Sequence, residues 1–239
     1  MSKYHAIWLV LLMACGGETT ETGDTAGEDG STELAADYFN GELELESVGA
    51  EPGETAAYWP ETAADVHAYV VAFEAPEPPY EIKSLGVDVL TGYGADGYRC
   101  SAEVPVELVA WVEEDATRDP TGYNAVDEND IPQLPALASA MATGQSPDDL
   151  SEDDNDGVVP VTAEFESPIR VRDAGRLFVA VKIQPQAEDV NDSPCILQYQ
   201  YDGPETMWMH SGGGSTIPKW EVHDKRANFR VTLAVHTEE

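Results

Sequence analysis

The residues best suited to chemistry crowd into one acidic stretch that ends at Gly157. Carboxylate and amide oxygens on a flexible loop are the ligands that calcium prefers. The stretch contains Asp148, Asp149, Glu152, Asp153, Asp154, Asn155 and Asp156. Counted from Glu152, the final ligand position of an EF-hand falls on Ala163, so the spacing does not fit that motif. Two interpretations stay open: a calcium site at Asp153, Asp154, Asn155 and Asp156, or a solvated acidic loop.

A second set of candidate residues is aromatic and would serve sugar binding. Aromatic rings that project outward from a sheet can stack on the faces of sugar rings. The candidates are Trp208, Trp220, Tyr199 and Tyr201, and Trp111 is a further one. Trp208 alternates with Met207 and Met209, so either the tryptophan or the two methionines face the core. The alternative to a polysaccharide-binding face is that these aromatic residues fill the core.

Catalytic motifs give no support to an enzyme. The chain has no Gly-x-Ser-x-Gly elbow and no His-Glu-x-x-His pair, so neither an α/β-hydrolase nucleophile nor that zinc site is indicated. With 46 acidic residues, some pair of carboxylates will always lie at glycosidase spacing, so such pairs carry no information. We therefore expect a protein that is not an enzyme, and keep a hydrolase as the alternative.

The N-terminus predicts export and anchoring. Lys3 precedes a short apolar run, AIWLVLLM, which is far below the roughly 20 residues of a membrane-spanning helix. The run ends in Leu12-Met13-Ala14-Cys15, followed by Gly16-Gly17. This pattern resembles the lipobox of bacterial lipoproteins, which implies removal of residues 1–14 and lipidation of Cys15. Gly16 in place of Asp implies sorting to the outer membrane, on its periplasmic face or at the cell surface. The alternative is a plain secreted protein.

Charge and cysteine content fit an exported protein. The chain carries 46 acidic and 12 basic residues, for a net charge of −34, which repels phosphates and excludes a nucleic-acid partner. With Cys15 lipidated, Cys100 and Cys195 remain, and two cysteines in an oxidising compartment predict one disulfide. In the chain-entropy model, closing that loop of about 95 residues would stabilise the fold by roughly 4–5 kcal/mol. Two buried free thiols are the alternative.

After Cys15 the sequence predicts a spacer and then one β domain. Residues 15–33 are the lipidated cysteine and an acidic, Gly- and Thr-rich stretch with too little apolar surface to fold, so we expect a disordered tether. Residues 34–239 form the single domain, with about ten strands that alternate between apolar and polar residues and have one wettable face each. The strands are expected at 42–46, 67–73, 85–89, 106–113, 159–165, 177–183, 197–201, 206–210, 219–223 and 229–235. This pattern predicts an all-β antiparallel sandwich.

Residues 114–157 interrupt the alternation, so we expect a long loop insertion between two strands, either functional or disordered. Within it, 137–143 could form a helical turn or two. If the insertion closes over a cleft, it is also where a hydrolase site would lie.

Several strings along the chain resemble those of a jelly-roll-like domain found in secreted and lipid-anchored bacterial proteins. They are PPYEI at 78–82, FESPI at 165–169, LFVAV at 177–181, and Trp220 followed by NFRV at 228–231. The resemblance implies a fold of non-catalytic accessory or surface domains. We therefore expect a lipid-anchored surface protein with a binding or structural role, whose partner is a polysaccharide or another surface protein and whose ligands include calcium as a candidate.

Overall fold

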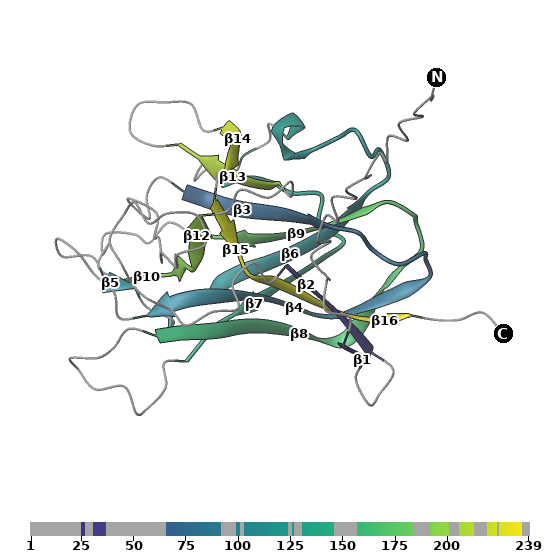
Figure 1. Ribbon diagram of the computed structural model, residues 1–239, viewed down its shortest axis with the longest axis horizontal. Coiled ribbons are helices and arrows are strands. Elements are labelled where there is room, and N and C mark those ends of the chain that lie inside the picture. Colours follow the sequence, from purple (N-terminus) through teal and green to yellow (C-terminus); the bar gives the residue numbers. More distant parts are fainter. Residues whose placement is uncertain are drawn as a thin grey trace, which may run out of the picture.

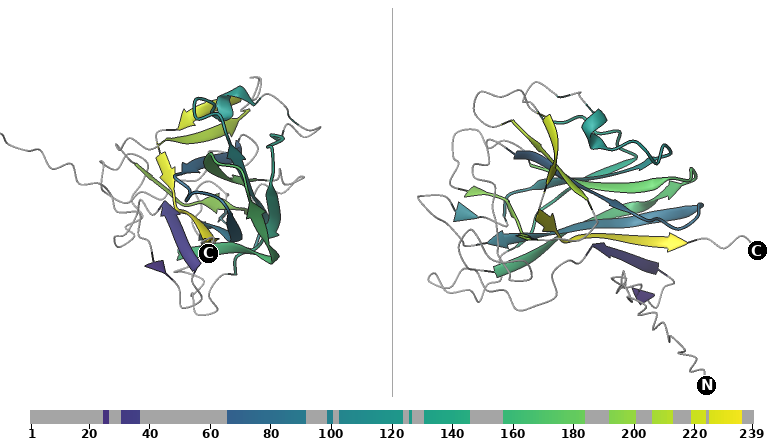
Figure 2. Two further views of the ribbon diagram at one scale, coloured as in Figure 1. Left: turned by 90° about the vertical axis from the view of Figure 1, so that its right-hand side faces the viewer. Right: turned by 45° about the horizontal axis from the view of Figure 1, so that its top comes forward.

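The structure is a computed structural model of all 239 residues. It describes residues 25–26, 31–36, 66–91, 99–100, 103–123, 126, 131–145, 157–183, 192–200, 206–212, 219–223 and 225–235. Strands dominate these ranges, and they form two antiparallel sheets that lie face to face as separate layers (Figures 1 and 2). The predicted all-β sandwich is confirmed.

Sheet A has six strands, with β4 at its centre. On one side β4 pairs with β8 along its whole length, and on the other it pairs with β16 and then with β11. β16 also pairs with β2, which pairs with β1. The bounds are β1 (Thr25–Ala26), β2 (Ser31–Ala36), β4 (Tyr80–Thr91), β8 (Gly157–Val171), β11 (Cys195–Ile196) and β16 (Phe229–Val235).

Sheet B also has six strands, in the order β14-β13-β3-β9-β6-β7, and all its pairs are antiparallel. Its two edges are β14 and β7, while β3, β9 and β6 lie inside the sheet. The bounds are β3 (Val66–Phe73), β6 (Val106–Glu113), β7 (Ala138–Ala142), β9 (Arg176–Lys182), β13 (Met207–Ser211) and β14 (Lys219–His223).

Smaller elements complete the described part of the chain. β12 (Gln198–Gln200) pairs with β15 (Lys225–Ala227), and β5 (Arg99–Cys100) pairs in parallel with β10 (Asp192–Ser193). The 3-10 helix η1 (Pro120–Gly122) follows β6 and lies on the side of sheet B that faces away from sheet A (Figures 1 and 2). In the described ranges no helix has the length and apolar content needed to cross a bilayer.

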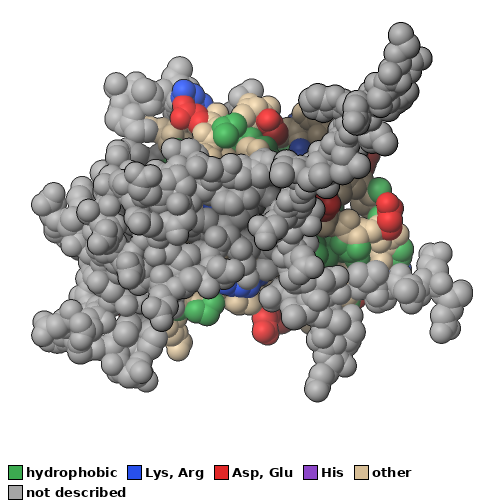
Figure 3. Space-filling model, in the orientation of Figure 1, with side chains coloured by type: hydrophobic (Ala, Val, Ile, Leu, Met, Phe, Trp, Pro, Cys, Tyr) green, Lys and Arg blue, Asp and Glu red, His purple; other side chains and the backbone are tan. Residues whose placement is uncertain are grey.

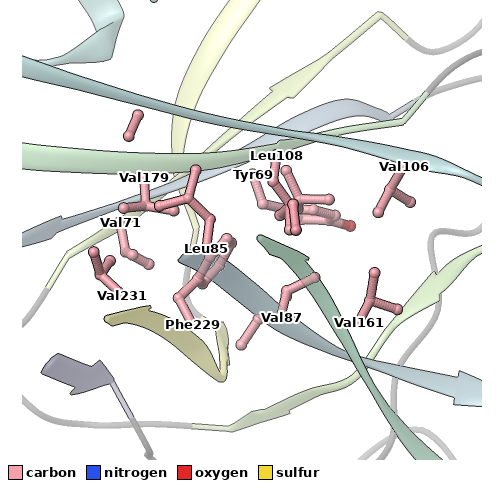
Figure 4. Close-up of a cluster of buried hydrophobic side chains, with 14 of the residues drawn as sticks. Tyr69, Val71, Leu85, Val87, Val106, Leu108, Val161, Val179, Phe229 and Val231 are labelled. Carbon is pink, nitrogen blue, oxygen red and sulfur yellow. The ribbon is translucent and has the colours of Figure 1, made fainter. Parts of the chain in front are cut away.

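The main core lies between the two sheets. Leu85, Phe229 and Val231 of sheet A point toward Val71 and Val179 of sheet B, and all five are at most 1% exposed (Figure 4). The alternation read from the sequence places Leu85, Val179, Phe229 and Val231 on the apolar face of their strands, because successive side chains of a strand point to opposite faces. We call the buried hydrophobic residues between the two sheets the inner core.

Sheet B has a second buried cluster on its outer face, and here the expectation of one wettable face per strand is wrong. The cluster is built mainly from large aromatic residues and small aliphatic ones, and we call it the outer cluster. It consists of Ala68, Val70, Val109, Trp111, Tyr123, Phe178, Ala180, Trp208 and Trp220. β3, β6 and β9 are therefore buried on both faces, and Tyr123 and Leu134 of the insertion pack against the outer one.

The insertion and the N-terminal segment differ from the sequence-based expectations. The insertion does lie between β6 and β8, but residues 138–142 form β7, paired with β6, and not a helical turn. Ala138, Ala140 and Ala142 face the inner core, and the pairing to β6 decides for a strand where the local sequence is indifferent. In the expected spacer, Thr25–Ala26 and the first residues of β2 are strands, so the folded part begins before Leu34. The strand expected at 42–46 lies outside the described residues.

Candidate ligand-binding cleft

The candidate site begins where β6 ends at Glu113 and the insertion turns back over sheet B. Two short polar turns fix this segment. The carboxylate of Asp115 accepts hydrogen bonds from the backbone N–H (2.9 Å) and the hydroxyl (2.7 Å) of Thr117. Asp119 caps η1 by accepting from the N–H of Thr121 at 2.9 Å, and Pro120 takes the first position of the helix, where no N–H is needed. The segment therefore has a defined path across the sheet.

Tyr123, directly after η1, docks the insertion onto the sheet. Its side chain is buried, and its hydroxyl accepts a hydrogen bond from Nε1 of Trp111 at 3.0 Å. The same hydroxyl donates to Oε2 of Glu113 at 3.1 Å. The rings of Tyr123 and Trp111 meet edge to face, with centroids 5.9 Å apart. One phenol group thus satisfies the indole and holds the carboxylate in place.

Arg118 lies over the ring of Tyr123. Its guanidinium carbon lies 5.0 Å from the ring centroid, within the range of a cation–π contact. Its Nη1 is 3.5 Å from Oε2 of Glu113, which is long for a charge-assisted hydrogen bond. The side chain of Arg118 is 53% exposed, whereas that of Glu113 is only 12% exposed. Arg118 is therefore the loosely held member of the group.

Next to Tyr123, a row of aromatic rings in contact runs across sheet B. Trp111 stacks on Phe178 with centroids 5.2 Å apart and planes 9° from parallel, and Phe178 in turn contacts Trp208 at 5.8 Å. Arg176 lies over Phe178 at 5.0 Å and donates to the carbonyl of Ala116 at 3.4 Å. This arginine ties the start of the insertion to the sheet.

The returning half of the insertion completes a cleft. Leu137 donates its N–H to the carbonyl of Ala110 at 2.9 Å, which brings the preceding residues alongside β6. Between the two halves lies a cleft of about 760 Å³, within the size range of small-molecule sites. It is lined by Val112, Glu113, Glu114, Asp115, Arg118, Gly122, Tyr123, Gln133, Leu134 and Pro135. At the top of Figure 3, over β14 and η1, acidic, basic and hydrophobic side chains lie close together.

The protonation states of Tyr123 and Asp115 suit the cleft for binding a polar ligand. The pKa of Tyr123 is raised, chiefly by burial, while the hydrogen bond and charge of Glu113 act in the same direction and the hydrogen bond from Trp111 opposes them. The phenol therefore stays a neutral donor at physiological pH. The hydrogen bonds from Thr117 lower the pKa of Asp115, so this carboxylate stays charged. A neutral phenol donor and the charged carboxylate of Asp115, together with apolar lining from Val112, Leu134 and Pro135, can orient a polar ligand.

The tryptophans predicted to bind sugar lie in the outer cluster. Trp208 is 4% exposed and Trp220 is 7% exposed, so neither offers a ring face for stacking. Their burial supports the interpretation that these aromatic residues fill a core. Trp111, at 1% exposure, is also buried, but its Nε1 orients Tyr123 and so contributes to the cleft indirectly.

The remaining predicted site residues are described only in part. Cys15, Tyr201, Asp153, Asp154, Asn155 and Asp156 lie outside the described residues, and for Tyr199 only its place in β12 is described. Cys195 is buried at the start of β11. The register of β5 and β10 sets Cys100 opposite Ser193, two positions from Cys195 in sequence. Cys100 thus lies on the strand that pairs with β10, and Cys195 follows β10 by two residues.

Two histidines meet on sheet B. The rings of His67 and His210 lie 5.6 Å apart, and His210 contacts Trp220 at 5.1 Å. The sequence separates these residues widely, and the pairing of β3 with β13 brings them together. Within the described ranges, no group of three or more His, Cys, Asp or Glu side chains is arranged to hold a metal ion.

The chain is thus an all-β sandwich with one insertion cleft among its described residues. It matches no protein-family model, and neither the curated proteins nor the solved structures contain a significant match. The function must therefore be argued from the residues of the cleft. Sequence reasoning missed Glu113, Arg118 and Tyr123, although the turn-forming pattern Asp-Ala-Thr-Arg-Asp-Pro at 115–120 could have marked an ordered segment.

Proposed function

We propose that this protein is a lipid-anchored, non-catalytic binding protein of the outer membrane, whose jelly-roll-like sandwich binds a polysaccharide in the insertion cleft. The observation that carries the binding role is the cleft itself, whose lining combines planar polar side chains with the apolar side chains of Val112, Leu134 and Pro135. Hydroxyl-rich ligands are oriented by such groups, namely the carboxylates of Glu113 and Glu114 and the amide of Gln133. The lipobox at Cys15 supports the anchor, and the net charge of −34 suits an exposed, soluble domain.

The binding role is tested with the purified protein on a panel of immobilised polysaccharides. We expect saturable binding to one class of polymer, and loss of that binding in Gln133→Ala and Leu134→Asp. Glu164→Ala is the control, because Glu164 is exposed on β8 of the other sheet. Binding that survives both cleft variants would contradict a site in the cleft. A panel without any binding would turn the search toward a protein partner.

The anchor has its own test in intact cells. Labelled palmitate should enter the wild-type protein but not Cys15→Ser, and the variant should leave the membrane fraction. Equal labelling of both proteins would contradict the lipidation of Cys15.

We also propose the Cys100–Cys195 disulfide and retain calcium at 153–156 as a candidate ligand. The placement of β5, β10 and β11 supports the disulfide, because it brings the two cysteines into the same region of the fold. Reduction should lower the melting temperature of the wild type and leave that of Cys100→Ser unchanged. A chelator should lower polysaccharide binding only if calcium takes part.

A hydrolase in the insertion gains no support from the cleft. Glu113 already accepts hydrogen bonds from the hydroxyl of Tyr123 and the backbone N–H of Asp115, and it lies 3.5 Å from the guanidinium of Arg118. The pKa of Asp115 is shifted downward, which is the opposite of what a general acid requires.

A further inference from the structure

Arg118 occupies a position in the cleft whose surroundings favour a cation. Three carboxylates line the cleft, those of Glu113, Glu114 and Asp115, and Arg118 is the one basic residue among its lining side chains. The guanidinium lies over the face of Tyr123 at 5.0 Å and against Glu113 at 3.5 Å. A ring face next to a carboxylate is a favourable site for any ammonium or guanidinium group.

The hold on Arg118 is weak enough for exchange. Its side chain is half-exposed, its ion pair is longer than the 2.7–2.9 Å of a good charge-assisted hydrogen bond, and exposed pairs contribute little to stability. By contrast, the groups that it contacts are held by hydrogen bonds: Trp111 donates to Tyr123, and Tyr123 donates to Glu113. A ligand cation could therefore displace Arg118 without rearranging the cleft.

We propose that the cleft selects saccharides that carry an ammonium group, and that Arg118 occupies the position of this group until the ligand displaces it. The inference rests on the proposed function and specifies its ligand. With Arg118 displaced, three carboxylates face the ligand, so charge complementarity favours a cationic sugar over a neutral or anionic one. The net charge of −34 attracts such a polymer over a longer range.

The test compares two ligands that differ only in this charge. Glucosamine oligosaccharides and their fully N-acetylated counterparts of equal length are titrated into the protein at a pH that protonates the free amines. We expect the glucosamine form to bind at least about tenfold more tightly. Arg118→Ala should tighten its binding by roughly five- to tenfold, because the competing cation is gone, while Arg118→Lys should stay close to wild type.

Control variants separate the cleft from the charge of the whole chain. Lys219→Ala removes one positive charge at an exposed site outside the cleft, and Glu164→Gln removes one negative charge on sheet A. We expect Glu114→Gln to weaken binding several-fold and both controls to leave it within about twofold of wild type. If Lys219→Ala tightens binding as much as Arg118→Ala, bulk charge is responsible and the proposal is wrong.

Other outcomes separate the binding function from the ammonium selectivity. Equal affinity for the two oligosaccharides, with loss in Gln133→Ala, would leave the binding function standing and overturn the ammonium selectivity. If neither oligosaccharide nor any other polysaccharide binds, the proposed function fails and the inference falls with it. Tight binding of an oligolysine peptide that responds to Arg118→Ala would assign the site to a protein partner and overturn the choice of a saccharide.

Discussion

Sheet B separates two buried regions that are built in different ways. On one side, the inner core is formed by two sheets and filled largely with Val, Leu, Ile and Phe. On the other side, the outer cluster is formed by one sheet and a single insertion, and it contains three of the chain's five tryptophans. The same strands, β3, β6 and β9, contribute to both.

The two regions differ in the types of side chain that fill them and in the elements that enclose them. Aliphatic side chains have no polar atoms and need only complementary shape and volume. The inner core therefore depends on packing between strands that are each hydrogen-bonded within a sheet. Indole and phenol groups also need hydrogen-bond partners, and Tyr123 supplies one for Trp111, whereas Nε1 of Trp208 and of Trp220 has none within the described part of the chain. A single insertion provides less buried area than a whole sheet. We therefore expect the inner core to determine global stability and the outer cluster to set local opening of the insertion.

The largest expected effect lies in the inner core. Phe229 is 0% exposed at the start of β16, and Phe229→Ala should lower the free energy of unfolding by about 3–5 kcal/mol through lost burial and the cavity left behind. Urea unfolding measures the change. Val222→Ala is the control, because Val222 is 66% exposed and should change stability by less than about 0.5 kcal/mol. A small effect of Phe229→Ala would contradict the assignment of global stability to this region.

A smaller effect is expected where the two regions meet, at Gly175 in the turn before β9. A Cβ atom there would lie 2.5 Å from the carbonyl oxygen of Glu113 and 2.8 Å from Cγ1 of Val112. Gly175→Ala must push back the end of β6, at a cost of about 1–3 kcal/mol for overpacking. Because Glu113 moves with that strand, ligand binding in the cleft should weaken as well. Unfolding and binding measured on one preparation check both, and unchanged binding would show that the cleft tolerates the shift.

The sequence predicts the inner core better than the outer cluster, for a physical reason. Alternation along 229–235 or 106–113 directly states which residues face inward, because the strand period is two. Burial of the outer face depends on where the insertion packs, and no local pattern encodes that contact. One signal was available: Leu177–Val181 is a continuous apolar run, which is typical of a strand buried on both faces. The turns at Asp115 and Asp119 were readable too, but the docking of Tyr123 on Trp111 is not local.

Tyr123→Phe tests the outer cluster alone. The change removes the acceptor for Nε1 of Trp111 and the donor to Glu113, and leaving a buried indole N–H unsatisfied costs about 1–2 kcal/mol. We expect this loss to appear as faster hydrogen exchange in 114–123, with less change in β16. Met141→Ala, at an exposed position of β7, should leave the exchange pattern unchanged. Uniformly faster exchange in both sheets would mean that the outer cluster also controls global unfolding.

The smallest expected effect comes from Tyr80, one of the two tyrosines of the inner core, and its sign is opposite. Tyr80 is 1% exposed, and its hydroxyl has no hydrogen-bond partner within the described part of the chain, whereas that of Tyr123 has two. Removing an unsatisfied buried hydroxyl relieves a desolvation penalty, so Tyr80→Phe should raise stability by about 1 kcal/mol.

The pH dependence provides an independent check on Tyr80. Burial raises its pKa from 10.0 to about 12, so the folded state holds the proton more tightly than the unfolded chain does. The stabilisation of the neutral phenol is fully present below about pH 10, and it declines as the pH rises toward 12. The gap in stability between Tyr80→Phe and wild type should therefore widen over that interval, because the variant lacks the titrating group. A constant gap would show that the Tyr80 hydroxyl reaches water. The inner core would then contain a phenol with a polar partner, as the outer cluster does at Tyr123.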